Sequence, residues 1–233
     1  MADRNVLDEQ LTYYRERAAE YDEWWERRGR YNRGKKATDL WRSEIAVVRA
    51  AFDELPLDGE VVELAAGTGY WTALLAARAD TVTVLDGSPE MLAINRARLG
   101  DLASKVEYQV VDLFEWYPTQ RWDGLVHCFW ISHVPRHKLD SFFESCRQAL
   151  NGRATMFFLD GQRVDESTAV DHKLPDDGNE VMTRKLNDGR EFQIVKNYYE
   201  PEELINTAEA AGFELEVHRT DTYFQYGVGT AVQ

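Results

Sequence analysis

Short apolar runs alternate with helical stretches through the middle of the chain. The apolar runs, each suited to one buried strand, lie at 61–64, 81–86, 106–111, 124–129 and 154–159. Stretches with helical periodicity follow three of these runs, at 71–78, 88–99 and 136–150. Strands that alternate with helices at this spacing build βαβ units on a buried parallel sheet. The pattern therefore predicts an α/β fold with a doubly wound, mostly parallel sheet.

Residues near the expected helix ends support this prediction. Ser88 is suited to cap the 88–99 helix, with Pro89 at its first position and Gly100 at its end. Thr38 is suited to cap an earlier helix, whose apolar stripe consists of Trp41, Ile45, Val48 and Phe52. Residues 7–28 also look helical and are rich in Tyr and Trp.

The last third of the chain has a different pattern. Asn187-Asp188-Gly189 separates two strand-like stretches, which is typical of a tight hairpin turn. A helix at 201–211 and one long strand at 214–226 are expected to follow. The sheet should therefore end in an antiparallel C-terminal edge. We expect one domain over 1–233, with an N-terminal helical lid (1–55), a core (56–160) and a C-terminal segment on the substrate side (161–233).

Composition and charge narrow the classes of function. The 233 residues include 27 Lys and Arg against 41 Asp and Glu, a net charge of −14. Because nucleic acids and anionic membranes are bound through basic surfaces, neither is an expected partner. Two cysteines cannot form a disulfide framework, and the charged N-terminus does not resemble a targeting peptide. These features predict a cytoplasmic protein and leave its oligomeric state open, a homodimer included.

The segment 61–69 is the most informative part of the sequence. An apolar strand carries the acidic Glu63 near its end and runs into a turn of small residues containing Gly67 and Gly69, after which a helix begins. Glycine lets the backbone approach a ligand closely at the carboxyl edge of a parallel sheet. A turn that needs glycine only for its dihedral angles is the alternative.

Two further acids favour a ligand site. Asp86 ends the second expected strand, and Asp112 ends the third. Carboxyl ends of parallel strands share one sheet edge, so both should lie near the glycine turn. A carboxylate at Asp86 can accept hydrogen bonds from both ribose hydroxyls, and one at Asp112 can accept a hydrogen bond from an adenine amine. Each acid alone would also suit a helix cap or a turn.

A nicotinamide dinucleotide fits this turn poorly. The third small residue of its fingerprint is replaced by Thr72, which follows the bulky Trp71, and Glu63 would repel a pyrophosphate. A cationic adenosine ligand without phosphate fits Glu63 better. The pattern resembles the class I S-adenosylmethionine-dependent methyltransferases, in which 63–69 corresponds to the first motif. Ala65 departs from that motif, where glycine is more usual.

The resemblance implies a Rossmann-like, seven-stranded sheet and a set of cofactor contacts. The methionine end of the cofactor would lie along Ala65, Gly67, Thr68 and Gly69. Gly87 and Met91 would flank the adenosine, with Leu113 and Phe114 against the adenine. Phe129 and Trp130 would face the sulfonium, whose charge suits an aromatic face. Met91 and Phe114 are equally suited to an ordinary core.

An N-terminal helical lid is also implied by the resemblance. Tyr14, Tyr21 and Trp25 share one face of the expected helix, which would suit either a lid or simple packing on the sheet. In similar enzymes such a helix covers the cofactor, and a loop aromatic reaches its carboxylate. We place Tyr14 and Tyr31 in these roles.

His133 is the histidine best placed for chemistry. It follows the fourth strand, at the sheet edge where methyl transfer would occur. A base there can take the proton of an attacking hydroxyl, and imidazole titrates in a suitable range. A role of His133 as a helix cap alone is the alternative, and His172 is the second candidate for a base and substrate contact. His127, inside the fourth strand, is expected to be a satisfied core residue, and acid-rich 160–172 is not assigned a metal.

The sequence therefore predicts an enzyme that transfers a methyl group from S-adenosylmethionine to a hydroxyl of a small molecule. Abundant tryptophan suits a sugar ring or an aromatic metabolite as acceptor. The chain is similar to actinobacterial small-molecule methyltransferases, a group that includes a sugar methyltransferase of methylmannose polysaccharide synthesis. Methylation of an amine or a carbon is the first alternative. A regulator that binds an adenosine ligand without catalysis is the second.

Overall fold

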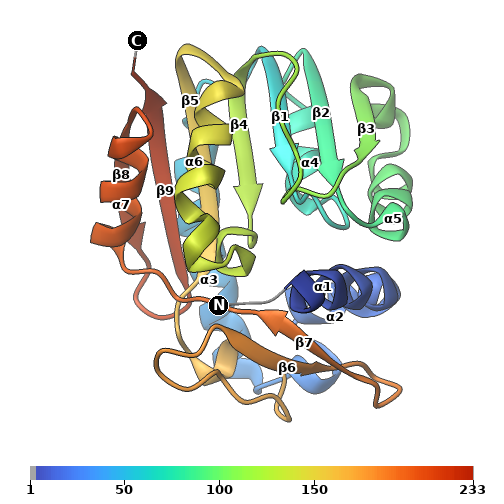
Figure 1. Ribbon diagram of the computed structural model, residues 1–233. Coiled ribbons are helices and arrows are strands. Elements are labelled where there is room, and N and C mark those ends of the chain that lie inside the picture. Colours follow the sequence, from blue (N-terminus) through green and yellow to red (C-terminus); the bar gives the residue numbers. More distant parts are fainter. Residues whose placement is uncertain (1–3, 233) are drawn as a thin grey trace.

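Seven strands form one sheet in the computed structural model, which describes residues 4–232 (Figure 1). Their order across the sheet is β3-β2-β1-β4-β5-β9-β8, and β9 runs antiparallel to both of its neighbours. The strands are β1 (Glu60–Leu64), β2 (Thr81–Asp86), β3 (Val106–Val110), β4 (Trp122–Cys128), β5 (Leu150–Gly161), β8 (Phe213–Arg219) and β9 (Phe224–Ala231). The predicted mostly parallel sheet with an antiparallel C-terminal edge is confirmed.

The single long strand predicted at 214–226 is wrong. Two strands occupy this region, because the chain reverses at the polar residues between β8 and β9. Thr220 closes the reversal, since its backbone N–H donates to the Phe224 carbonyl over 2.9 Å. Polar residues with backbone bonds of this kind are typical of turns.

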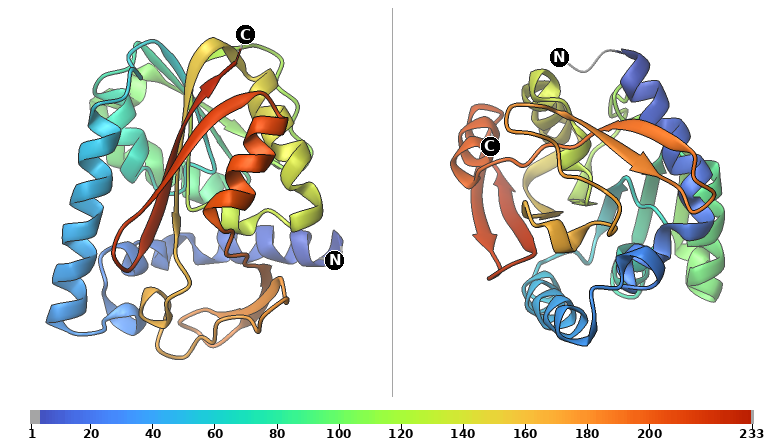
Figure 2. Two further views of the ribbon diagram at one scale, coloured as in Figure 1. Left: turned by 90° about the vertical axis from the view of Figure 1, so that its left-hand side faces the viewer. Right: turned by 90° about the horizontal axis from the view of Figure 1, so that it is seen from below.

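Helices cover both faces of the sheet (Figure 2). On one face α6 (Leu139–Gln148) and α7 (Pro201–Ala210) pack on side chains such as Val62 and Leu125. On the other face α3 (Lys35–Asp53), α4 (Tyr70–Ala76) and α5 (Pro89–Leu99) pack on alternate positions such as Val61 and Val126. This alternation follows from the two-residue period of a strand, and it buries both faces as a parallel sheet requires.

Helix α5 begins and ends where the sequence predicts. The Ser88 hydroxyl accepts a hydrogen bond from the Met91 N–H over 3.1 Å, Pro89 takes the first turn, and Gly100 follows Leu99. Helix α3 begins three residues before the predicted cap at Thr38. Gly34, whose φ is +88°, supplies the non-helical residue that precedes it.

The N-terminal segment is not one continuous helix. Helix α1 (Arg4–Arg17) is followed by the 3₁₀ turns Ala18–Glu20 and Gly29–Tyr31, with the short α2 (Tyr21–Trp25) between them. The break turns the chain, so Trp24 reaches the end of β4 and contacts the Phe129 ring, with centroids 4.7 Å apart.

A separate hairpin lies with α1 across the carboxyl ends of the parallel strands (Figure 1). The hairpin consists of β6 (Val181–Lys185) and β7 (Glu191–Val195), joined at the predicted Asn187-Asp188-Gly189 turn. Its apolar residues pack on Tyr13 of α1. Gln10 of α1 accepts a hydrogen bond from the Val195 N–H over 2.9 Å. This layer covers the sheet edge at which the predicted site residues gather.

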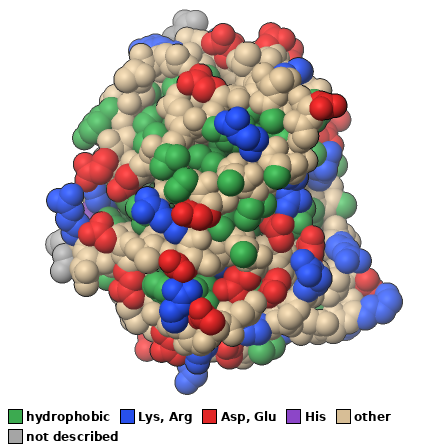
Figure 3. All heavy atoms as spheres, turned by 90° about the vertical axis from the view of Figure 1, so that its right-hand side faces the viewer, with side chains coloured by type: hydrophobic (Ala, Val, Ile, Leu, Met, Phe, Trp, Pro, Cys, Tyr) green, Lys and Arg blue, Asp and Glu red, His purple; other side chains and the backbone are tan. Residues whose placement is uncertain are grey.

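The remaining short elements are 3₁₀ turns in the segments that connect strands and helices. They span Gly100–Lys105, Ile131–His133, Arg136–Lys138 and Asp165–Ser167. Acidic and basic side chains are interspersed over the face that Figure 3 shows, on the side of β3 and α5. None of the helices within residues 4–232 is both long enough and apolar enough to span a bilayer.

Candidate active site

The turn after β1 is strained at a residue other than glycine. Ala65 has a φ of +51°, between Leu64 at the strand end and Gly67, whose φ is +54°. Gly69 precedes α4 with a φ of +92°, and a Cβ there would lie 2.8 Å from the Asn95 side chain. Only glycine fits position 69 without movement of its neighbours. At Ala65 the methyl group makes the left-handed conformation costly.

Glu63 is a buried carboxylate within a chain of side-chain hydrogen bonds. It is 1% exposed, and its Oε2 accepts a hydrogen bond from the Thr72 hydroxyl over 2.6 Å. Asn95 donates to Thr72 in turn, and Tyr108 donates to Asn95. Burial raises the pKa of Glu63 to about 8, the Thr72 bond opposes this rise, and the charge of Asp86 adds to it. No cation among the described residues forms an ion pair with this carboxylate.

Asp86 joins the loops that follow β1 and β2. Its carboxylate accepts hydrogen bonds from the Gly67 N–H over 2.9 Å and from the Ser88 N–H over 2.8 Å. Burial raises the pKa of Asp86 to about 6, although both hydrogen bonds oppose this rise. Asp112 lies two residues beyond β3 and is exposed; it accepts a hydrogen bond from the Phe114 N–H over 2.9 Å.

These loops surround a cavity at the carboxyl ends of the strands, here called the strand-end cavity. It is lined by the predicted residues Tyr14, Ala65, Gly67, Asp86, Gly87, Met91, Asp112, Leu113, Phe114, Phe129, Trp130 and His133. Tyr21, expected on the face of the lid helix, also lines the cavity, and Leu7, Gln10, Leu11, Val111 and Cys128, which were not predicted, complete the lining. A smaller pocket under the glycine turn adjoins it and includes the predicted Glu63, Thr68 and Gly69. The structure therefore brings most of the predicted residues to one place.

Helix α1 closes the strand-end cavity over the loop after β2. Arg15 donates two hydrogen bonds to the Gly87 carbonyl, at 3.1 and 3.2 Å. A Cβ at Gly87 would lie 2.5 Å from the Leu11 side chain, so glycine permits this close approach.

Phe129 is strained at the end of β4. Its φ is +60°, a conformation that bulky side chains rarely adopt. Its ring packs edge-on against both Trp24 and Trp25. Phe129 and Tyr21 line the strand-end cavity, the pocket under the glycine turn and a third cavity behind them. Such strain persists only where surrounding contacts hold it, and it is common at functional sites.

His133 is held in one orientation at the boundary between the strand-end cavity and the third cavity. Its Nδ1 lies 2.7 Å from the Val195 carbonyl oxygen, an acceptor, so the ring proton is assigned to Nδ1. Nε2 therefore accepts the hydrogen bond of the Tyr14 hydroxyl, 2.8 Å away. Burial lowers the pKa of His133 well below its ordinary value, and the positive charge of Lys196 lowers it further.

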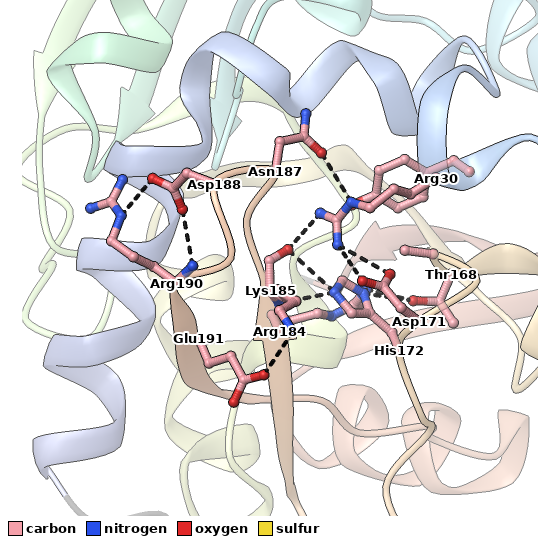
Figure 4. A network of polar contacts seen from close by, with 12 residues as sticks. Arg30, Thr168, Asp171, His172, Arg184, Lys185, Asn187, Asp188, Arg190 and Glu191 are labelled. Carbon is pink, nitrogen blue, oxygen red and sulfur yellow. Dashed lines mark hydrogen bonds and ion pairs between the residues drawn. The ribbon is translucent and has the colours of Figure 1, made fainter.

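Tyr31 and His172 lie outside the strand-end cavity, so their predicted direct contacts need correction. Tyr31 is 2% exposed, and its hydroxyl accepts a hydrogen bond from Arg17 over 3.1 Å. Both ring nitrogens of His172 are occupied: the Lys185 N–H donates to Nε2 over 2.9 Å, and Arg184 lies 3.1 Å from Nδ1 (Figure 4). Burial, then the Arg184 charge, lowers the pKa of His172 to about 3.

His127 is buried in β4 as predicted but is not satisfied. Neither ring nitrogen has a hydrogen-bond partner among the described residues, and the ring stacks on Phe158. Burial lowers its pKa to about 3, so the ring is neutral.

The third cavity contains residues that the sequence analysis did not single out. It is here called the cationic cavity. Its lining consists of Tyr14, Arg17, Tyr21, Trp24, Phe129, His133, Gln162, Ser167, Arg184, Lys196 and Tyr198. The cations come from α1, β6 and the segment after β7, which no local sequence pattern connects.

The acid-rich segment 160–172 does not form a metal site in the structure. Asp160 is 1% exposed and accepts hydrogen bonds from the Ser132 and Gly161 N–H groups. No group of three or more His, Cys, Asp or Glu within residues 4–232 has an arrangement that suits a metal ion.

Comparisons with known proteins agree with this geometry. A family model described as a methyltransferase domain matches residues 61–152. The solved DhpI–SAH complex is 32% identical to the chain, with 99% of each chain covered and a TM-score of 0.78. The chain belongs to the class I S-adenosylmethionine-dependent methyltransferases. S-adenosylmethionine is accordingly its cofactor.

Two further structures extend the comparison. The DhpI–SAM–HEP complex is also 32% identical, covers 98% of this chain and 99% of its own, and has a TM-score of 0.81. A methyltransferase from Mesorhizobium loti is 20% identical over 81% of this chain and 97% of its own, with a TM-score of 0.60; it shares the fold. No curated protein sequence matches the chain.

Proposed function

We propose that this methyltransferase transfers the methyl group to a hydroxyl of a small molecule and that the pair Tyr14–His133 removes the hydroxyl proton. The observation that carries the proposal is the 2.8 Å contact between the Tyr14 hydroxyl and His133 Nε2, where two cavities meet. A general base must lie within hydrogen-bond reach of the proton that it takes, directly or through one intervening group.

The strand-end cavity fits the cofactor on its own chemistry. Glu63 is a buried carboxylate without a cationic partner among the described residues, and a cationic ligand would offset the cost of its burial. Asp86 keeps acceptor capacity beyond its two backbone bonds and would bind the ribose hydroxyls. Asp112 with Leu113 and Phe114 would bind the adenine. When bound, the cofactor supplies an electrophilic methyl group.

Proton removal follows from the orientation of His133. The Val195 carbonyl keeps the ring proton on Nδ1, so Nε2 is free to accept a proton. As the acceptor oxygen attacks, its proton passes to the Tyr14 oxygen while the Tyr14 proton passes to Nε2. Gln10 fixes the backbone of Val195 and of His133, because its side chain accepts a hydrogen bond from the Val195 N–H and donates one to the His133 carbonyl.

A ring-shaped acceptor such as a sugar has aromatic surfaces available beside the transfer position. Trp24 and Phe129 line the cationic cavity, and Trp130 lines the strand-end cavity. Aromatic faces of this kind suit a sugar ring or a flat metabolite. We further propose that the chain forms a single domain, because one seven-stranded sheet includes strands from both halves of it. We also propose a cytoplasmic location, because Cys128 and Cys146 are both free.

Substitution of His133 tests the proposal. His133→Ala should lower turnover of a hydroxyl acceptor roughly 100-fold or more, the usual scale for a positioned base. Affinity for S-adenosylhomocysteine should be nearly unchanged. His133→Asn is the matched control for positioning, since it can form hydrogen bonds but cannot accept the proton. Wild-type turnover in both variants would overturn the proposed base.

The pH profile and the range of acceptors together test this proposal against its alternatives. Because the pKa of His133 lies well below the ordinary value, the base stays deprotonated through neutral pH and should give no acidic limb in the usual histidine range. Efficient methylation of amines by His133→Ala would favour amine methylation. Tight cofactor binding with no turnover of any acceptor would favour a regulator.

A further inference from the structure

The cationic cavity contains more buried positive charge than the protein neutralises. Arg17 is 5% exposed and Arg184 is 9% exposed. Neither forms an ion pair with a carboxylate of the described chain. Burial of a charge is costly unless the charge is paired. Two buried guanidinium groups on one cavity therefore indicate a missing anion.

The contacts of Arg184 leave part of its guanidinium unpaired. Its Nη1 donates to the Thr168 hydroxyl over 2.6 Å and lies 3.1 Å from His172 Nδ1 (Figure 4). Its Nε is buried and has no hydrogen-bond partner among the described residues. Figure 4 also shows Arg30, which pairs with Asp171 and bonds to the Lys185 carbonyl behind this group. These contacts fix the direction of Arg184 without neutralising it.

Arg17 is held by aromatic rings rather than by a carboxylate. Its guanidinium lies 4.7 Å from the centre of the Tyr21 ring and 5.6 Å from that of Tyr31, and one Nη donates to the Tyr31 hydroxyl. Aromatic faces support a cation but carry no net charge to cancel it.

Lys196 is the third cation of this cavity and the only one of the three with an acidic partner in the described chain. Its Nζ lies 3.4 Å from Asp160 and donates to the Ser132 hydroxyl over 2.6 Å. Asp160 also accepts two backbone hydrogen bonds, so its charge is shared between Lys196 and the backbone. The cavity thus has three cations and one carboxylate within contact distance.

We propose that the methyl acceptor carries an oxyanion, a carboxylate or a phosphoryl group, which Arg17 and Arg184 bind in the cationic cavity. The planar guanidinium of arginine suits both oxyanions, because it donates paired hydrogen bonds. Tyr14, Phe129 and His133 line this cavity as well, so an anion bound there places the rest of the acceptor at the transfer position. This proposal rests on the proposed function, since it names the substrate class of the same site.

The anion would also assist the base. The charges of Lys196, Arg184 and Arg17 all disfavour protonation of His133. A negative group among these cations would offset their effect and make His133 a better proton acceptor while the acceptor is bound. Anionic acceptors should therefore have a higher kcat as well as a lower KM than uncharged ones.

Calorimetric titration of the full chain loaded with S-adenosylhomocysteine tests the anion site directly. Sodium phosphate and sodium acetate are the probes, and glycerol is the uncharged control. We expect at least one anion to bind, and the tighter of the two identifies the group as phosphoryl or carboxylate. Arg17→Gln and Arg184→Gln should each weaken that binding roughly 10- to 100-fold.

Matched variants distinguish a specific loss of anion binding from misfolding of the protein. Arg184→Lys keeps the charge and should retain most of the anion affinity. Arg190→Gln changes an exposed arginine beside the same hairpin, paired with Asp188 and Glu16, and should leave anion binding unchanged. Unchanged affinity for S-adenosylhomocysteine shows that each variant is folded. Equal anion binding by wild type and both glutamine variants, or binding of neither probe by wild type, would overturn the proposal.

A comparison of charged and uncharged acceptors distinguishes failure of the anion site from failure of the proposed hydroxyl methylation. Turnover is compared on pairs of hydroxyl acceptors that differ mainly in charge, a hydroxy acid with its amide and a hydroxyalkyl phosphate with its uncharged dimethyl triester. A preference for the charged member that Arg184→Gln abolishes supports the proposal. Anion binding without methylation of any hydroxyl would leave the anion site intact and reject hydroxyl methylation instead.

Discussion

The strand-end cavity and the cationic cavity differ in charge and in origin. The first is bordered by Asp86 and Asp112, and Glu63 lies in the smaller pocket that adjoins it; all three are at or near the end of a strand. The second is bordered by Arg17, Arg184 and Lys196, from segments that meet only in the folded protein. Opposite charges suit opposite ligands, so a cationic cofactor and an anionic acceptor would each favour a different side. Each acidic residue of the first cavity region therefore has its own local sequence pattern, whereas the basic cavity forms only through tertiary packing.

The two sides meet at residues that belong to both. Tyr14, Tyr21, Phe129 and His133 line both cavities. The strained backbone of Phe129 and the fixed ring of His133 lie at this boundary. Preorganised groups at the boundary would hold the reacting atoms in line without a further ordering cost.

Removal of the Asp86 carboxylate is expected to have the largest effect on the acidic side. Asp86→Ala should weaken cofactor binding by on the order of 2–3 kcal/mol, roughly 30- to 150-fold, because charge-assisted hydrogen bonds to the ribose are lost. Calorimetry with S-adenosylhomocysteine measures the loss. Asp80→Ala, at the exposed opposite end of β2, is the matched control and should bind normally.

The acceptor KM, measured at saturating cofactor, should change little in Asp86→Ala. A rise in the acceptor KM as large as the loss of cofactor affinity would show that the two cavities are not independent. Normal cofactor affinity would assign the ribose contact to another residue, and failure to fold would make Asp86 structural, since it joins two loops.

The sequence predicted the acidic side well because each of its residues has a local pattern. Asp86 follows an apolar run, and Ser88 with Pro89 marks the helix that begins next to it. The mostly parallel sheet follows from the same alternation of strands and helices. Period and turn chemistry are sufficient for these features, because they act over a few neighbouring residues.

The basic side could not be predicted for a physical reason. Arg17 and Arg184 look like surface arginines in the sequence, and only the packing of α1 against the β6–β7 hairpin buries them. The placement of His172 behind Arg184 and of Tyr31 beside Arg17 follows from that same packing. A long-range contact of this kind leaves no periodic pattern in either segment.

The pH dependence of cofactor affinity tests whether the cation of the cofactor binds near Glu63. Burial raises its pKa to about 8, so the carboxyl is protonated at neutral pH when no cation is bound. A cationic ligand binds the charged form better, so affinity for S-adenosylmethionine should rise roughly eightfold from pH 7 to pH 8.5. Glu63→Gln removes this titration, and the difference between the two profiles excludes titration of the ligand itself. Identical profiles would place the cation away from Glu63.

The stability of the ligand-free protein should fall as the pH rises, whereas the cofactor affinity should rise. The pKa of Glu63 is higher in the folded state than the ordinary value of 4.5. Its contribution to stability is therefore fully present below pH 4.5 and is lost as the pH rises through about 8. Thermal unfolding of wild type against Glu63→Gln at pH 6 and pH 8.5 measures this loss, and the cofactor should raise the melting temperature more at the higher pH.

The smallest expected effect concerns the strain at Ala65. Its φ of +51° costs an alanine about 1–2 kcal/mol, whereas glycine adopts this conformation freely. Glycine also gains entropy in the unfolded chain, which opposes folding by about 0.5–1 kcal/mol. Ala65→Gly should therefore stabilise the protein by about 0.5 kcal/mol in denaturant unfolding, with cofactor affinity almost unchanged.

Ala66→Gly is the matched control. Ala66 has no positive φ, so the entropic cost is not offset and the protein should be destabilised by about 0.5–1 kcal/mol. Destabilisation by both changes would show that the Ala65 methyl group contributes packing that outweighs its strain.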